Sequence, residues 1–189
     1  MPRRKTAFLP GQYYHLYNRG NNRQKIFFER DNYLFFLRRF RHYLVNSTLN
    51  VNAYCLMPNH YHFLVHLCQQ DFSQKMQAFT LSYTKAMNKR YRRCGSIFQG
   101  RFQAILVNSD AYLLHLSRYI HLNPVEAGLV KRPEDWEFSS YVDYVGLRQG
   151  TLPKMKNLLA QVGSADAYQH FTNTEHIVET PEIKQLMLD

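Results

Sequence analysis

The segment Met57-Pro58-Asn59-His60-Tyr61-His62-Phe63-Leu64-Val65 decides how this chain folds. In a strand, the two histidines of this segment lie on one face, and the aromatic residues Tyr61 and Phe63 lie on the other. Strand residues at i and i+2 are about 6.6 Å apart, so two imidazoles can converge on one divalent ion. The residue between them then anchors the strand in the core. A lone His-x-His pair is usually a pair of solvent-facing imidazoles, but here the opposite face is wholly apolar, which favours metal binding by His60 and His62.

Hydrophobic patterning around this segment predicts an alternation of strands and helices. The expected strands are residues 12–19, 49–57, 60–67 and 98–107. The expected helices run from Asp31 to about Asn46, from Asp71 or Ser73 to a break at Cys94-Gly95-Ser96, and from Asn108, Ser109 or Asp110 to Pro124. The first six elements predict an α+β fold with a ferredoxin-like antiparallel sheet and helices packed on one face. Residues 131–189 are expected to form a C-terminal extension of helices and loops.

A second segment, Arg118-Tyr119-Ile120-His121-Leu122-Asn123-Pro124, adds a possible nucleophile and a possible ligand. Tyr119 and Asn123 are four residues apart, so they share one face of a helix. A phenol can act as a nucleophile, and a side-chain amide oxygen can be a third metal ligand. Pro124 is expected to end the helix, because proline disfavours helical geometry at the residue before it. This places Asn123 at a helix boundary.

The charge of the chain is unevenly distributed and indicates a polyanionic partner. The formal net charge is +10 at pH 7, with +12 on residues 1–149 and −2 on residues 150–189. A domain this basic commonly binds nucleic acid; a solvated basic surface without a partner is the alternative. No apolar run is long enough to span a bilayer, and the basic N-terminus lacks the apolar stretch of a secretion signal. We therefore expect no membrane partner and a cytoplasmic, nucleoid-associated location.

Four blocks of sequence together resemble a known family. They are Tyr-His-Leu-Tyr-Asn-Arg-Gly at 14–20, Ala-Tyr-Cys-Leu-Met-Pro-Asn-His-Tyr-His at 53–62, Phe-Gln-Gly-Arg-Phe at 98–102 and Arg-Tyr-Ile-His-Leu-Asn-Pro-Val-Glu-Ala-Gly at 118–128. In this order they resemble the REP-associated tyrosine transposases, which are single-tyrosine members of the HUH endonuclease and transposase superfamily. The resemblance covers roughly residues 13 to 145.

The resemblance implies a domain, an activity and a substrate. It implies an HUH transposase-like catalytic domain at residues 1–130, with residues 131–189 packed on it. The activity would be metal-dependent cleavage and strand transfer of single-stranded DNA by Tyr119, through a 5′-phosphotyrosine intermediate, on palindromic hairpins. Two imidazoles and an amide oxygen leave open positions that suit one Mg²⁺ or Mn²⁺ ion. The chain could act as a monomer or as a homodimer.

Further residues are candidates for DNA contact or for a supporting role. The basic and aromatic candidates are Arg3, Arg4, Lys5, Arg19, Lys89, Arg90, Arg92, Arg93, Phe98 and Arg101. The run around Phe98 could stack on unpaired bases, or it could simply be the start of a strand with a turn glycine. His15 lies on the strand expected beside that of His60, and His115 lies one helical turn before Tyr119. Both could support the reaction, and both could simply pack.

Three alternatives stay open at this point. Tyr91 and Tyr112 compete with Tyr119 for the role of nucleophile, because chemistry alone does not select one of the 14 tyrosines. Tyr119 is preferred for its Arg118 neighbour, its Asn123 partner and the family motif. A replication initiator or relaxase of the same superfamily would share the histidine pair. A DNA-binding regulator could keep the fold without catalysis.

Overall fold

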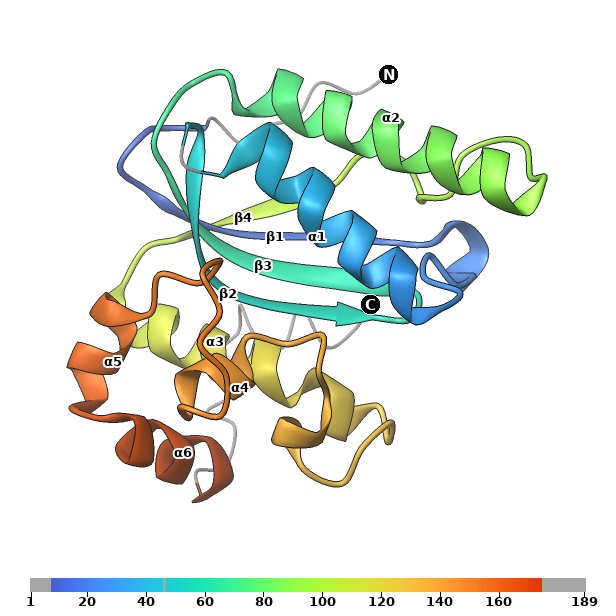
Figure 1. Cartoon of the computed structure of the whole chain (residues 1–189). Coiled ribbons are helices and arrows are strands. Elements are labelled where there is room, and N and C mark those ends of the chain that lie inside the picture. The colour runs from blue at the N-terminus through green and yellow to red at the C-terminus, as the bar shows by residue number, and fades with distance from the viewer. Residues whose placement is uncertain (1–7, 46, 175–189) are drawn as a thin grey trace.

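The computed structural model describes residues 8–45 and 47–174. Helices α1 and α2 cover one face of a four-stranded antiparallel sheet of order β2-β3-β1-β4 (Figure 1). These elements are β1 (Tyr13–Arg19), α1 (Arg30–Leu44), β2 (Leu49–Met57), β3 (His60–Leu67), α2 (Phe72–Tyr91) and β4 (Gln103–Val107). Their sequence and strand order are those of the ferredoxin-like fold. The predicted fold class is confirmed.

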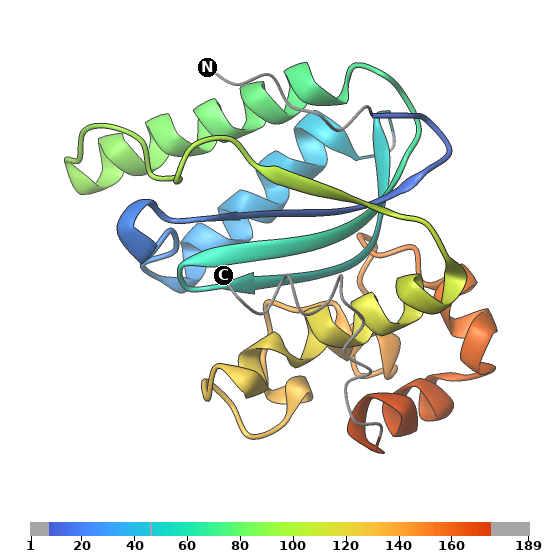
Figure 2. The ribbon, with the colours of Figure 1, turned by 180° about the vertical axis from the view of Figure 1, so that it is seen from behind.

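A second layer lies on the other face of the sheet (Figure 2). Helix α3 (Asp110–Glu126) crosses that face, and the following elements gather around it: η2 (Pro133–Asp135), α4 (Tyr141–Tyr144), α5 (Lys156–Val162) and α6 (Ala165–Thr174). Tyr141, Tyr144 and Tyr168 share one hydrophobic cluster with α3 and with β2 and β3. The extension therefore packs on α3 and also bonds directly to β2, for example through Ser140 and Tyr54, whereas the boundary at residue 130 stays a prediction.

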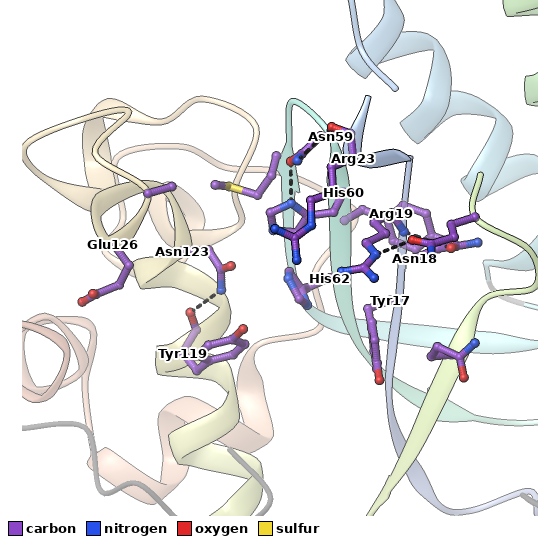
Figure 3. Close-up of a pocket in the computed structure, with 15 residues that line it drawn as sticks. Tyr17, Asn18, Arg19, Arg23, Asn59, His60, His62, Tyr119, Asn123 and Glu126 are labelled. Carbon is purple, nitrogen blue, oxygen red and sulfur yellow. Dashed lines mark hydrogen bonds between the residues drawn. The ribbon is translucent and has the colours of Figure 1, made fainter. Parts of the chain in front are cut away.

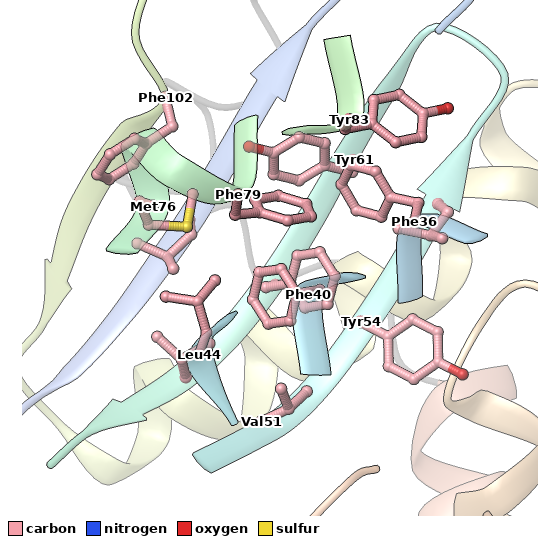
Figure 4. Packing of buried hydrophobic residues seen from close by; sticks show 14 of the residues in the cluster. Phe36, Phe40, Leu44, Val51, Tyr54, Tyr61, Met76, Phe79, Tyr83 and Phe102 are labelled. Atoms are coloured by element: carbon pink, nitrogen blue, oxygen red, sulfur yellow. The ribbon is translucent and has the colours of Figure 1, made fainter. Parts of the chain in front are cut away.

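The core between the sheet and the first two helices is mainly aromatic (Figure 4). Phe40 of α1 stacks on Phe63 of β3 with ring centroids 4.1 Å apart. Phe36 meets Tyr61 at 5.2 Å and the edge of Phe79 at 4.8 Å. Full burial of one such side chain contributes roughly 1.5–3 kcal/mol. Tyr61 and Phe63 are therefore fixed toward this core, which turns the residues between and beside them to the opposite face.

Two predicted boundaries on this side of the molecule were wrong. Helix α1 begins at Arg30 and not at Asp31, because Glu29 and Asn32 form a reciprocal capping box. Strand β4 begins at Gln103 rather than at residue 98. The residues before it turn at Gly100, whose φ of 80° lies in the left-handed region.

No described helix is long and apolar enough to cross a bilayer.

Gly20 joins the end of β1 to the turn between β2 and β3. Its amide donates to the carbonyl of Asn59 at 2.7 Å, and the 3₁₀-helix η1 (Asn21–Arg23) follows it. A Cβ at Gly20 would lie 1.9 Å from the carbonyl oxygen of Gln24. Because φ is −64° at Gly20, the requirement is for space and not for a left-handed backbone. This explains the glycine of the Asn-Arg-Gly block.

We expect Gly20→Ala to lower the free energy of unfolding by about 3 kcal/mol, since the new methyl group collides with main chain that cannot move aside freely. Urea unfolding measures this loss. Gly95→Ala is the matched control: its Cβ would meet nothing within 4 Å, and only its φ of +83° is unfavourable, at roughly 1 kcal/mol. A smaller loss at Gly20 than at Gly95 would refute the steric explanation.

Candidate active site

A cavity of about 820 Å³ lies between the sheet and α3, on the face opposite α1 and α2 (Figure 3). Strands β1 and β3 form one wall and α3 forms the other. The residues named in Figure 3 that line it are Tyr17, Asn18, Arg19, Arg23, Asn59, His60, His62, Tyr119, Asn123 and Glu126. The cavity thus brings together the predicted nucleophile and all three predicted metal ligands.

The alternation along β3 sends both histidines to the cavity, as predicted. His60 and His62 have ring centroids 5.0 Å apart with an interplanar angle of 84°. Tyr61 between them is fully buried on the opposite face of the sheet. The two imidazoles face the same space because the core holds the residue that separates them.

Each imidazole of the pair is held by a hydrogen bond at its Nδ1 atom. Asn59 Oδ1 lies 2.7 Å from His60 Nδ1, and His15 Nε2 lies 2.9 Å from His62 Nδ1. His15 comes from β1, which pairs with β3, and it is completely buried. His15, predicted as a possible supporting residue, therefore contacts His62 directly. His115 instead meets Phe171 of α6 at 5.4 Å and does not line the cavity.

Burial keeps the imidazoles at the cavity floor neutral. It lowers the pKa of His15 to about 3 and holds the pKa of His62 well below its usual range, with smaller contributions from His60 and His15. Burial also lowers the pKa of His60; a hydrogen bond with the Asn123 side chain opposes this effect, and the charge of Arg19 adds to it. A neutral imidazole is the form that binds a metal.

Helix α3 presents Tyr119 and Asn123 to the histidines, as the i+4 spacing predicted. The rings of Tyr119 and His62 meet edge to face with centroids 5.7 Å apart. Asn123 Nδ2 donates to the carbonyl of Tyr119 at 2.8 Å. The amide oxygen of Asn123 therefore faces His60. Pro124 does not end the helix, which continues to Glu126. Proline so close to the end removes only one helical hydrogen bond, while the Asn123 and Pro124 carbonyls still accept from Ala127 and Leu129.

Arg118 and His121 hold α3 from the side that faces away from the cavity. Arg118 Nε donates to the carbonyls of Phe171 and Thr172 at 3.1 Å each, near the end of α6. His121 is fully buried, and its two nitrogens lie 2.8 Å from Tyr168 Oη and from Ser140 Oγ. Arg118 therefore anchors the helix to the extension, and it does not line the cavity as a cation beside Tyr119.

The competing tyrosines lie elsewhere. Tyr91 Oη donates to Glu29 at 2.6 Å, on the α1–α2 side of the sheet. Tyr112 is buried in the cluster beneath α3, about two turns before Tyr119, and does not line the cavity. Of the three candidates, Tyr119 alone lies against the histidine pair.

The predicted DNA-contacting residues divide into several groups. Arg19 lines the cavity, where its Nε donates to Gln99 Oε1 at 2.5 Å. Arg90 pairs with Glu29, and Arg93 donates to Gln24 and lies over the ring of Phe28. Lys89, Arg92 and Arg101 are exposed, and Arg3, Arg4 and Lys5 lie outside the described residues.

Phe98 corrects one prediction of DNA contact. It is only 2% exposed, and its ring packs against Tyr61 and Tyr83. Because Phe98 fills the core under α2, it has no face available for stacking on a base. An alternating aromatic and basic run does not by itself distinguish a stacking residue from one that closes the core.

Sequence analysis did not find Tyr17, Arg23 and Glu126, which also line the cavity. Tyr17 shares its strand face with His15, so strand periodicity carried a usable signal. Glu126 lies three residues after Asn123 on the same helix, and it was missed because the helix was expected to end at Pro124. Arg23 reaches the cavity through the irregular turn after β1, for which the sequence pattern carries no signal.

The donor set suits a divalent cation. His60 and His62 each have Nδ1 in a hydrogen bond, which leaves Nε2 for a ligand, and this is how metal-binding imidazoles are usually supported. Within residues 8–45 and 47–174, no three His, Cys, Asp or Glu side chains cluster as a metal site. Two imidazoles and one amide are therefore the set that could hold the ion, with further positions left for phosphate oxygens or water.

Comparison with known proteins agrees with this geometry. The family model described as "Transposase IS200 like" matches residues 9–123, a segment that includes both walls of the cavity. The REP-associated tyrosine transposase of Escherichia coli K12 is 32% identical over 95 residues, covering 48% of this chain and 53% of that protein. A Haemophilus influenzae relative assigned to the same group is 31% identical over 101 residues, covering 47% of this chain and 57% of that protein.

One solved structure has the same fold. It is a REP-associated tyrosine transposase bound to a REP hairpin, with a TM-score of 0.65 and 22% sequence identity. The match covers 77% of this chain and 86% of that chain. By contrast, the chain spans about half the length of the curated relatives that it matches.

Buried neutral histidines predict that the protein loses stability in mild acid. Burial lowers the pKa of His15 and of His121 to about 3, whereas an unfolded imidazole titrates near 6.5. The stability from each is complete above pH 6.5. Between about pH 6.5 and 3 only the unfolded chain takes up these protons, so the free energy of unfolding falls by up to about 1.4 kcal/mol per pH unit for each histidine.

Urea unfolding at pH 7 and pH 5 tests this for His121. We expect His121→Gln to be less stable than the wild type at pH 7, because Tyr168 and Ser140 lose a shared partner. Between the two pH values it should lose about 2 kcal/mol less than the wild type, since it lacks one titrating group. Equal losses would mean that the His121 imidazole does not stay neutral in the folded protein.

Proposed function

The chain belongs to the IS200-like transposase family, and we propose that it is a metal-dependent endonuclease and strand transferase for single-stranded DNA. The observation that carries the proposal is the meeting of Tyr119 and Asn123 with His60 and His62 in one cavity. The net charge of +10 supports a polyanionic substrate.

In the proposed reaction, the phenolic oxygen of Tyr119 attacks the phosphorus of the scissile phosphodiester. An O–P bond to the tyrosine forms while the bond from phosphorus to the 3′ oxygen breaks. The phenolic proton passes to solvent, and the leaving oxygen takes up a proton to give a free 3′-OH. The product is a 5′-phosphotyrosine, which retains the energy of the broken bond, so that water or another 3′-OH can later displace the tyrosine.

Side chains of both walls position the phosphate for this attack. Arg19 and Arg23 line the cavity and would bind the phosphate oxygens. His60, His62 and Asn123 would hold one Mg²⁺ or Mn²⁺ ion, which when bound supplies Lewis-acid polarisation of the phosphate. The contacts of α3 with the extension hold Tyr119 at a fixed distance from the histidines, which reduces the entropy cost of aligning the nucleophile.

The proposed substrate is a palindromic hairpin with a single-stranded 5′ flank. The support is the solved structural relative, a REP-associated tyrosine transposase bound to a REP hairpin. The cavity has a volume of about 820 Å³ and lies between a sheet and a helix, which suits one extended strand better than a duplex. The hairpin stem would then lie outside the cavity, along the basic surface.

We expect Tyr119→Phe to abolish a covalent protein–DNA adduct while DNA binding and folding persist, because only the nucleophilic hydroxyl is removed. Denaturing electrophoresis with 5′- and 3′-labelled single strands measures the adduct, and peptide mapping locates it. Tyr112→Phe is the matched control, since it removes a hydroxyl from the same helix outside the cavity. Cleavage by Tyr119→Phe at the wild-type rate would indicate a hydrolytic nuclease, and absence of any wild-type adduct would favour a non-catalytic regulator.

The exposed cations at the end of α2 should contribute salt-sensitive affinity. Each phosphate contact adds about 0.7–0.9 to the slope of log affinity against log salt. We expect the double variant Lys89→Ala, Arg92→Ala to weaken hairpin binding and to flatten this slope by about 1.5. Lys75→Ala, which removes a charge paired with Asp71 at the other end of the same helix, should leave the slope unchanged. Equal effects of the two changes would show that only net charge matters.

A further inference from the structure

We propose that His15 is a positioning residue that supports the metal-binding tautomer of His62. By accepting the Nδ1 proton of His62, His15 leaves the Nε2 lone pair of His62 facing the cavity for a divalent cation. This inference rests on the proposed function, because it concerns the same cation site. It assigns a task to a buried polar side chain that does not line the cavity.

The other imidazole of the pair faces an amide oxygen at its Nδ1 atom. Asn59 Nδ2 donates to the carbonyl of Arg23 at 3.4 Å, which orients the amide so that its oxygen faces His60 Nδ1. An amide oxygen can only accept a hydrogen bond. A proton on Nδ1 of His60 satisfies this contact and leaves a lone pair on Nε2 for a cation, whereas a proton on Nε2 would satisfy the Asn123 side chain, whose oxygen faces His60.

The partner of His62 leaves the choice open, because it is a second imidazole. In one arrangement His62 Nδ1–H donates to His15 Nε2, and His62 presents a lone pair to the cavity. In the other, His15 Nε2–H donates to His62 Nδ1, and His62 presents an N–H that cannot bind a metal. The 2.9 Å separation fits both arrangements. A cation at the site selects the first, since the nitrogen bound to it cannot carry a proton.

The surroundings of His15 show that this contact is its main polar interaction. Within the described part of the chain, its Nδ1 atom is buried without a hydrogen-bond partner. Its ring lies nearly parallel to that of His62, at 11°, and it also stacks on Tyr17 at 5.0 Å. An apolar side chain would fill the same space without the unpaired Nδ1 of His15, but it would leave Nδ1 of His62 without its partner. Packing alone therefore does not explain a histidine here, whereas acceptance of the His62 proton does.

Two amide variants separate this role from a general need for a polar side chain. The amide of glutamine reaches the position of His15 Nε2, so His15→Gln can still accept the proton. The amide of asparagine ends one carbon earlier, so His15→Asn keeps the chemistry but cannot reach His62. A third variant, His15→Leu, removes the polar group and the unpaired nitrogen together.

Calorimetric titration with Mn²⁺ in the absence of DNA gives the first readout. We expect His15→Gln to bind Mn²⁺ within about threefold of the wild type, whereas His15→Asn and His15→Leu lose about 10- to 100-fold in affinity. The thermal midpoint of each metal-free variant, measured in parallel, checks that it is folded. Wild-type Mn²⁺ affinity in His15→Asn or His15→Leu, or an equal loss in all three variants, would overturn the proposal.

The tautomer itself gives the second readout. Two-bond ¹H–¹⁵N correlation spectra distinguish a ring protonated on Nδ1 from one protonated on Nε2. We expect His62 to carry its proton on Nδ1 in the Mg²⁺-loaded wild type and in His15→Gln. A proton on Nε2 of His62 under Mg²⁺ saturation would refute the assignment.

One more variant distinguishes a failure of this inference from a failure of the proposed function. His60→Ala removes a predicted ligand that does not contact His15. If His60→Ala loses Mn²⁺ affinity and His15→Asn does not, then the role of His15 fails while the metal site stands. If His60→Ala binds Mn²⁺ as well as the wild type, the metal site is wrong and both proposals fail.

Discussion

The alternation of side chains along β3 is the constraint on which the rest of the structure depends. Tyr61 and Phe63 are fully buried beneath α1 and α2. A shift of the strand by one residue would expose both rings and place His60 and His62 in the core. Loss of one such ring costs about 3–5 kcal/mol, a large share of a typical domain's stability of about 5–15 kcal/mol. The aromatic core therefore holds the imidazoles at the cavity without contacting them.

The nucleophile side of the cavity is tied to the same sheet through a buried polar chain. His121, two residues after Tyr119, contacts Ser140 Oγ at 2.8 Å, and Ser140 Oγ accepts from the amide of Tyr54 on β2 at 2.8 Å. Strand β2 pairs directly with β3. This chain of contacts, together with the hydrophobic cluster that α3 shares with β2 and β3, positions Tyr119 relative to the histidines. Buried networks of this kind are favourable only when every member has a partner, which makes the placement of α3 specific.

The sequence predicted which side chains share a face of a strand or helix, because these faces follow from periodicity. It did not predict contacts between residues that are distant in sequence, because these depend on packing. The faces of β3 and the shared helix face of Tyr119 and Asn123 depend on fixed repeats of two and 3.6 residues, so both were predictable. Phe98 was assigned to DNA contact and Arg118 to the neighbourhood of Tyr119 from residue type and position alone. Their partners, Tyr61 and the end of α6, are distant in sequence. Glu126 was missed through a local rule about Pro124 that fails in a last helical turn.

Charge in the cavity is arranged so that no buried group is ionised before a substrate arrives. The imidazoles of His15, His60 and His62 have lowered pKa values and are neutral at pH 7, while Arg19 and Arg23 supply positive charge at the cavity wall. A cation alone would enter against those two guanidinium groups, with the Glu126 carboxylate as the opposing charge in the cavity lining, whereas a phosphodiester is attracted by both guanidinium groups. In the proposed reaction the cation and the scissile phosphate therefore stabilise each other in the cavity, and a tightly bound resting metal is not required.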